Sequence, residues 1–196
     1  TNRKILPMKT LKILLLTTCL VGFSSVAAAQ WQPGAVNETG NTSIVLGTGS
    51  GISVTKISDL YFGDIKPVSK SGGSIAINPQ NGAVTILSGS FVLSGSTSIA
   101  RFDLQGPNAQ RNYSYSLPAS VVLRNPQGNT MTISDMRVYK NPQSGQAGQG
   151  NNTGSGQTNN QGKASIYVGG TLNINANQAN GVYSNTSDLK LVIILQ

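Results

Sequence analysis

The amino-acid sequence predicts an all-β fold in a single domain. Apolar and polar residues alternate with a period of two in several stretches, whereas no stretch after residue 29 has the apolar spacing of a helix of ordinary length. Short clusters of Gly, Pro, Asn and Ser separate these stretches and are typical of tight turns. Short strands joined by frequent turns indicate a sandwich or a barrel.

The N-terminal part has the pattern of a secretory signal peptide. Residues 1–7 precede the first candidate initiator, Met8, and we interpret them as upstream translated sequence. Residues 8–29 contain a basic start, an apolar centre over residues 13–23 and a small-residue cleavage motif that ends at Ala29. The apolar centre is shorter than the roughly 18–20 residues that a membrane-spanning helix needs. We therefore expect cleavage after Ala29, an exported mature chain and no membrane span; an uncleaved membrane anchor is the alternative.

The charge of the mature chain is modest. Four of the 14 basic residues lie before the cleavage site, namely Arg3, Lys4, Lys9 and Lys12, so the mature chain has 10 basic and 6 acidic residues, a net charge of +4. No run of Lys or Arg follows Lys12. Nucleic-acid binding needs a clustered basic face, so we expect no nucleic-acid partner.

The residues that most enzymes rely on are missing. The chain has no histidine, and its only cysteine, Cys19, lies inside the signal peptide. The mature chain therefore lacks the usual general base, a thiolate nucleophile and the commonest zinc ligands. Lipidation of Cys19 would need a small residue directly before it, where Thr18 stands. The six acidic residues are scattered along the sequence: Glu38, Asp59, Asp64, Asp103, Asp135 and Asp188. We expect no catalysis, no cofactor and no metal site.

The mature chain divides into an arm and a domain. Residues 30–51 form a polar N-terminal arm, and residues 52–196 form the β-domain. The arm contains one short apolar run, made of Ile44, Val45 and Leu46. This run is either the first strand of the domain or a detachable segment.

Within the domain, strands and turns follow one another. Residues 74–77 and 83–87 are expected to form a hairpin around an Asn-Pro-Gln-Asn-Gly turn. Residues 100–105 and 112–117 alternate strictly between apolar and polar residues, which predicts strands with one face in a core and one in water.

A long polar segment interrupts this pattern. Residues 141–162 are almost entirely Gly, Asn, Gln, Ser and Thr. Such a segment cannot offset the entropy of ordering by burying apolar surface. We expect a disordered loop between a strand that ends near Tyr139 and one that starts near Ala164; the alternative is a binding loop.

The last stretch of the chain is apolar on both faces. Leu189, Leu191, Ile193 and Leu195 share one face and alternate with Lys190, Val192 and Ile194. A strand of this kind belongs inside a sandwich or is covered by a partner, because as an exposed edge it would aggregate.

Six short motifs carry a family resemblance: DLYFGDI at 59–65, GSIAINP at 73–79, ARFDLQG at 100–106, YSYSLP at 113–118, YVGGTL at 167–172 and GVY at 181–183. In this order and spacing, from Ile52 onward, they resemble the bacterial exported family catalogued as domain of unknown function 4402. The resemblance implies an immunoglobulin-like antiparallel β-sandwich. Members are often encoded beside fimbrial chaperone and usher components, which implies a pilus subunit or an adhesin. The final residues lack the penultimate aromatic that is common in chaperone-assembled pilins.

We therefore expect a non-enzymatic exported surface protein, a fimbrial or pilus subunit or an adhesin, that passes through the periplasm to the cell surface or the extracellular space. Its partners would be other copies of itself or a fimbrial chaperone and usher, joined by strand addition. The candidate residues are Leu189, Leu191, Ile193 and Leu195 for the strand that receives a partner, and Ile44, Val45 and Leu46 for the donor. Alternatively, all of them are ordinary core strands of a complete sandwich.

A second function class also fits the sequence. A free-standing extracellular module would bind glycan or protein through aromatic residues, for which the candidates are Trp31, Tyr61, Tyr139 and Tyr167, or through loop residues. Tyrosines in strands are also common in cores and at their rims, so the sequence leaves this choice open.

Overall fold

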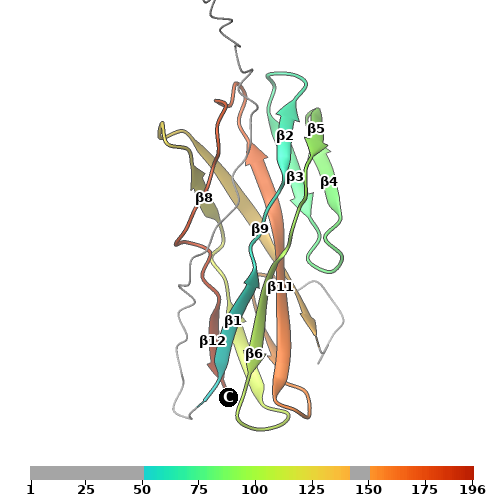
Figure 1. Ribbon diagram of the computed structural model, residues 1–196, viewed down its shortest axis with the longest axis vertical. Helices are drawn as coiled ribbons and strands as arrows, with labels where there is room; N and C mark the ends of the chain where they lie inside the picture. The colour runs from blue at the N-terminus through green and yellow to red at the C-terminus, as the bar shows by residue number, and fades with distance from the viewer. Residues whose placement is uncertain (1–50, 142–150) are drawn as a thin grey trace, which may run out of the picture.

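The computed structural model of the chain describes residues 51–141 and 151–196 (Figure 1). Within these residues every regular element is a β-strand, and all strand pairs are antiparallel. The strands are β1 (Ser53–Ser58), β2 (Asp64–Pro67), β3 (Gly73–Ile77), β4 (Val84–Ser88), β5 (Phe91–Ser94), β6 (Ala100–Gln105), β7 (Asn112–Ser116), β8 (Val121–Arg124), β9 (Thr130–Asn141), β10 (Thr153–Gln157), β11 (Lys163–Ile174) and β12 (Val192–Leu195). The predicted all-β fold is confirmed.

The large sheet is organised around β11. Along one edge β11 pairs with β9, from Ser165 opposite Asn141 to Asn173 opposite Thr132. Along its other edge it pairs first with β6 and then with β3. β1 extends the sheet beyond β6, β4 extends it beyond β3, and β8 pairs with β9. The expected hairpin at 74–77 and 83–87 is present as β3 and β4.

A pair of glycines marks the point where β11 changes partners from β6 to β3. A Cβ atom on Gly169 would collide with the carbonyl oxygen of Ile77 and would lie 2.9 Å from Cδ of Pro79. The chain leaving β3 therefore crosses close to the backbone of β11 at this residue. Only glycine allows that approach without moving one of the two strands.

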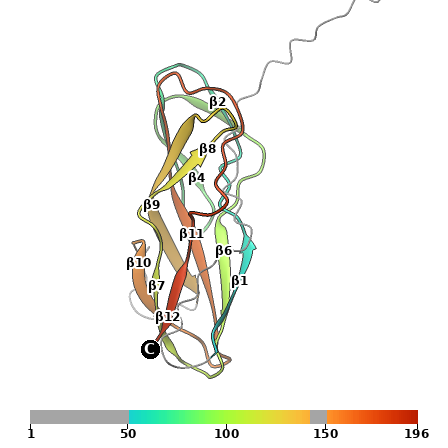
Figure 2. The same ribbon diagram turned by 90° about the vertical axis from the view of Figure 1, so that its left-hand side faces the viewer.

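A second, smaller sheet completes a sandwich. It has the order β10, β7, β12, and Figure 2 shows it as a layer on the left, with β6 and β1 of the large sheet in the opposite layer on the right. Buried residues from both layers form one core, among them Phe102 and Ile166 of the large sheet and Tyr113 and Ile193 of the small one. A two-stranded ribbon, β2 with β5, accompanies β3 and β4 at the opposite end of the molecule. The predicted antiparallel sandwich in one domain is thus confirmed.

A buried tyrosine holds the long connection between β11 and β12. The hydroxyl of Tyr183, which is fully buried, donates to the carbonyl oxygen of Ala179 at 2.7 Å and accepts from Nε2 of Gln178 at 2.6 Å. A tyrosine hydroxyl bound to the backbone a few residues upstream is the arrangement of the tyrosine corner in immunoglobulin-like sandwiches. It fixes the path of the chain toward β12.

The expectation of a disordered loop over 141–162 is wrong for residues 151–162. There β10 pairs with β7, from Thr153 opposite Ser116 to Gln157 opposite Asn112. A turn follows in which Oδ1 of Asn159 accepts backbone N–H groups, an Asx turn that needs no apolar side chain. Main-chain pairing and turn chemistry order this stretch although its composition is polar. Residues 142–150 of the predicted loop lie outside the described residues.

The glycines of β10 are the physical reason for this difference. A Cβ atom on Gly156, which is buried, would lie 2.5 Å from Cζ of Tyr113. The tyrosine ring of β7 thus occupies the space that a side chain on β10 would need, so the ring supplies the apolar cover. Lys140 adds a further link, because its Nζ donates to the carbonyl oxygen of Ser155.

The predicted upstream residues 1–7, the signal peptide 8–29 with cleavage after Ala29, and the arm up to residue 50 lie outside the described residues. They remain predictions.

Substitution of Gly156 tests the packing of β10. We expect Gly156→Ala to lower the free energy of unfolding by about 1–3 kcal/mol, because the fully buried Tyr113 ring cannot move away from an added methyl group. Ser155→Ala is the matched control, since Ser155 is exposed on the same strand. Urea denaturation of both variants measures the difference. Equal stability of the two variants would contradict the ring-over-glycine packing.

A second prediction concerns alkaline pH. Burial raises the pKa of Tyr113 to about 12 from an ordinary value of 10.0, and within the described residues its hydroxyl has no hydrogen-bond partner. Because the folded state holds this proton more tightly than the unfolded state, the contribution to stability is complete below pH 10 and is lost as the pH rises through 12. At pH 11 the loss amounts to about 1.4 kcal/mol.

Tyr113→Phe should remove this alkaline loss and leave stability at pH 8 unchanged or higher by up to about 1 kcal/mol, because no hydrogen bond is broken. Urea midpoints of the two proteins at pH 8 and pH 11 measure the effect, and the other tyrosines ionise in both. A parallel decline of both proteins between these pH values would refute the assignment to Tyr113.

Candidate strand-addition edge

The large sheet and the small sheet each have an edge strand on the same side of the sandwich. Within the described residues β1 pairs only with β6, and β12 pairs only with β7. Figure 1 shows both strands at the left side of the molecule, and Figure 2, which views that side, shows them in the two opposite layers. Among the described residues, this side of the sandwich is therefore bounded by two strand edges that pair with no further strand.

The hydrogen-bonding phase of β12 decides which of its backbone groups face outward. The N–H of Gln196 donates to the carbonyl oxygen of Asn112 at 2.9 Å. In an antiparallel pair the bonded residues alternate, so Ile194 also directs its N–H and C=O toward β7. Ile193 and Leu195 direct theirs to the other edge, where no strand pairs with them in the described part of the chain.

The four side chains predicted for this edge are all in the core. Leu189, Leu191, Ile193 and Leu195 are 2%, 0%, 0% and 9% exposed, respectively. Ile194, on the opposite face, is 40% exposed. The sandwich already uses the apolar face of β12, and the backbone edge is what remains for a partner. The other predicted group, Ile44, Val45 and Leu46, lies outside the described residues.

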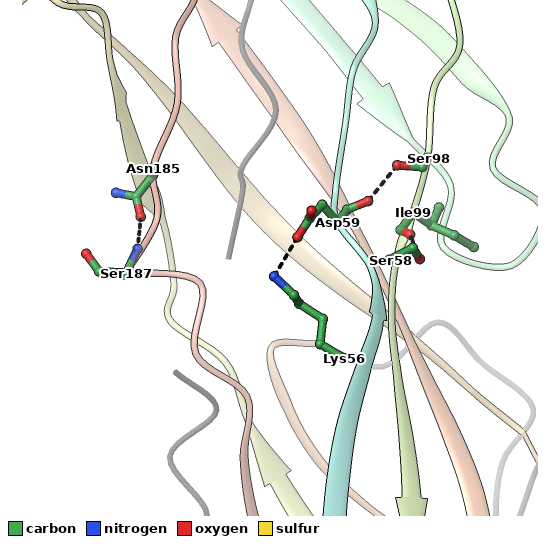
Figure 3. Close-up of polar contacts among 7 residues, drawn as sticks. All are labelled: Lys56, Ser58, Asp59, Ser98, Ile99, Asn185 and Ser187. Atoms are coloured by element: carbon green, nitrogen blue, oxygen red, sulfur yellow. Dashed lines mark hydrogen bonds and ion pairs between the residues drawn. The ribbon is translucent and has the colours of Figure 1, made fainter. Parts of the chain in front are cut away.

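The turn that leads into β12 is held by one side chain. Oδ1 of Asn185 accepts the N–H group of Ser187 at 2.9 Å (Figure 3). It also accepts the N–H group of Asp188 at 2.7 Å, and Nδ2 of Asn185 donates to the carbonyl oxygen of Val122 at 2.8 Å. Hydrogen bonds from Asn185 and Ser187 lower the pKa of Asp188. These bonds fix the direction in which the chain enters Leu189 and the strand.

The edge strand β1 changes from apolar to charged along its length. Val54 packs against the core, and Lys56 lies on the same face two residues later, where its Nζ is 2.8 Å from Oδ1 of Asp59 (Figure 3). The hydroxyl of Ser98 donates to the carbonyl oxygen of Asp59 at 2.6 Å and holds this end in place. A strand lying along β1 would meet an apolar residue near its start and an ion pair near its end. The period-two alternation of β1 would have placed Lys56 beside Val54, but sequence reasoning did not use it.

The aromatic residues proposed for ligand binding lie at separate places. Tyr139 of β9 and Tyr167 of β11 are cross-strand neighbours, with ring centroids 5.9 Å apart. Tyr61 lies apart from them and contacts Asp64; burial and that carboxylate raise the pKa of Tyr61. Trp31 lies outside the described residues. The structure thus brings together two of the four candidates.

Residues 51–141 and 151–196 contain no group of three or more His, Cys, Asp or Glu side chains that could hold a metal ion. The same ranges contain no helix with the length and hydropathy of a membrane span.

Comparison with known proteins gives one result. The model of the family described as domain of unknown function (DUF4402) matches residues 52–192. This range begins just before β1 and ends at the first residue of β12. No curated protein and no solved structure matches the chain.

The role of β12 in the core can be tested on the isolated domain. We expect Leu191→Ala and Ile193→Ala each to lower the free energy of unfolding by about 2–5 kcal/mol, because both side chains are fully buried. Ile194→Ala on the same strand should cost less than about 1 kcal/mol. Chemical denaturation measures all three. A loss below 1 kcal/mol for both buried positions would show that β12 does not belong to the folded core.

Proposed function

Because the chain belongs to the family described as domain of unknown function 4402, whose description assigns no activity, we propose a role for it from its geometry. The protein is a non-enzymatic structural subunit of a bacterial surface assembly, a fimbrial or pilus subunit, and copies join by adding a strand to the outer edge of β12. The supporting observation is the outer backbone edge of β12, with which no strand of residues 51–141 and 151–196 pairs. The core-facing side chains of this strand, Ile193 and Leu195, are already buried.

An open edge of this kind is unusual in a monomer. Natural sheets blunt their edges with charged residues, bulges or prolines. Here β1 carries Lys56 and a register shift, β8 ends on Arg124, and the pairing of β4 has an irregularity at Ser74. In contrast β12 reads Val-Ile-Ile-Leu and pairs in continuous register. An edge without such protection is consistent with one that a partner covers.

The donor in this proposal is the arm of a second copy, with its apolar residues Ile44, Val45 and Leu46. Main-chain hydrogen bonds would supply affinity, and alternate side chains of the arm would supply specificity. Before assembly, a fimbrial chaperone would cover the same edge of β12 in the periplasm. Export through the predicted signal peptide, with cleavage after Ala29, places the subunit there and then at the cell surface.

Removal of the arm tests self-assembly. We expect the chain from Gln30 to form concentration-dependent oligomers in size exclusion with light scattering, and the chain from Gly51 to be monomeric. A peptide of residues 40–50 should bind the shortened chain, whereas a scrambled peptide should not. A chain from Gln30 that stays monomeric at millimolar concentration and behaves like the shortened one would refute self-assembly through the arm.

A backbone substitution locates the contact on β12. Ile193→Pro removes an N–H that points away from β7 and places the proline ring on the open edge, whereas Ile193→Ala removes a similar side chain and keeps the N–H. We expect oligomers with Ile193→Ala and at least about tenfold weaker association with Ile193→Pro, which corresponds to 1.4 kcal/mol or more. Leu195→Pro and Leu195→Ala repeat the comparison at the next outward position. Equal association of Pro and Ala variants that remain folded would show that the partner does not use this edge.

A further inference from the structure

The outer face of the large sheet carries a polar and aromatic cluster opposite the core. Arg101 and Asp103 of β6, Ser165 and Tyr167 of β11, and Tyr139 of β9 all lie at positions that alternate with buried residues of the same strands. Their side chains therefore point away from the small sheet. We call these five residues the outer-face cluster.

Direct contacts fix the outer-face cluster in one geometry. Nε and Nη2 of Arg101 donate to Oδ1 and Oδ2 of Asp103 at 2.8 and 2.9 Å, a bidentate pair. The hydroxyl of Ser165 donates to Oδ1 of Asp103 at 2.7 Å. Cζ of Arg101 is 5.6 Å from the ring centroid of Tyr167, which in turn is 5.9 Å from that of Tyr139. Contacts thus run unbroken from the carboxylate on β6 to the ring on β9.

A hollow lies directly beside the cluster. It has a volume of about 410 Å³, and Arg101, Asp103 and Ser165 form one side of it. The hydroxyls of Ser53 and Thr55 and the amide of Gln105 are among the groups that complete its wall. The hollow therefore combines hydroxyl, amide, carboxylate and guanidinium groups. The two tyrosine rings are not part of its wall; the ring of Tyr167 adjoins it through Arg101, which lies in both the wall and the cluster.

We propose that the outer-face cluster and this hollow form a binding site for a neutral saccharide. A sugar ring presents C–H groups on its faces and hydroxyls around its rim, so it needs an aromatic surface for the first and planar donors and acceptors for the second. Tyr139 and Tyr167 supply the surface. Asp103, Gln105 and Arg101 supply the donors and acceptors.

The arrangement of charge decides between neutral and anionic saccharides. Arg101 is already paired with Asp103 through two hydrogen bonds, so its charge is compensated inside the cluster. Lys163 is the remaining cation in the wall of the hollow. A neutral ligand fits this balance better than a polyanion.

The site lies on paired strands, which hold its side chains in fixed positions before a ligand binds. Groups on neighbouring strands of a paired sheet keep their spacing, and ordered groups lose little freedom when a ligand binds. The site lies on the large sheet, whereas the open edge of β12 belongs to the small one, so the inference stands independently of strand addition. It would give a structural subunit an adhesive surface.

The test uses the mature chain from Gln30 on an array of immobilised neutral and anionic oligosaccharides of defined structure, followed by titration of the best-bound sugar in solution. We expect binding to at least one neutral saccharide. Tyr139→Ala and Tyr167→Ala should each weaken it at least about tenfold, and Arg101→Lys should weaken it because lysine lacks the planar bidentate geometry.

Two controls separate this site from the rest of the surface. Thr85→Ala alters another hollow of the large sheet, and Tyr61→Phe alters the tyrosine that lies elsewhere; neither should change binding. Thermal denaturation confirms that each variant is folded. The proposal is overturned if no saccharide binds above the level of the Tyr139→Ala/Tyr167→Ala double variant. Binding confined to anionic saccharides and abolished by about 0.5 M salt would overturn it as well.

Discussion

Hydrogen bonding along both edges of β11 is the constraint on which the rest of the structure depends. The strand has β9 on one edge and β6 followed by β3 on the other, so three chain segments take their positions from it. The exchange of β6 for β3 occurs at Gly169 and Gly170, and at Gly169 the backbone of Ile77 approaches too closely for a side chain. The edge strands of the large sheet, β1, β4 and β8, each pair with one of these three neighbours of β11. The inner residues of β11, such as Ile166 and Val168, carry the core on which the small sheet rests.

The strand β11 also separates the core of the sandwich from the outer face of the large sheet. Its inner residues face β7 and β12 across the core, and its outer residues include Ser165 and Tyr167. Because side chains alternate along a strand, the outer face can change without repacking the core. Hydrogen bonds to a strand at the edge of β12 would lie within the plane of the small sheet, and thus involve neither the inner nor the outer face of β11. The saccharide site and the strand addition that we propose therefore use geometrically independent parts of this fold.

Alternation in the sequence was sufficient to predict the strands that bury one face. Residues 100–105 and the hairpin at β3 and β4 lie where alternation and turn residues placed them. The strand β10 was missed because glycines replace the apolar residues that the rule looks for, and the cover comes from Tyr113, some forty residues earlier. The pairing of β2 with β5 could not be predicted either, since it is set by the sandwich rather than by local pattern. At the candidate edge, the sequence predicted the buried face of β12, but only the register with β7 shows which backbone groups point outward.

The energetics of β12 explain why a strand can belong to the core and still accept a partner. Burial of Leu191 and Ile193 fixes the strand on the sandwich, because removing such side chains from water is worth about 1.5–3 kcal/mol each. The outward N–H and C=O groups of Ile193 and Leu195 contribute nothing to that burial, and no strand pairs with them in the described part of the chain. Exchanging water for a strand at such groups gains only about 0.5–1.5 kcal/mol per bond, so main-chain pairing over a short edge gives weak association. Durable assembly then requires apolar side chains on the added strand, placed between β12 and the apolar start of β1 at Val54. The ion pair of Lys56 and Asp59 at the other end of β1 limits how far that apolar contact extends, which sets a length for the added strand as well as its composition.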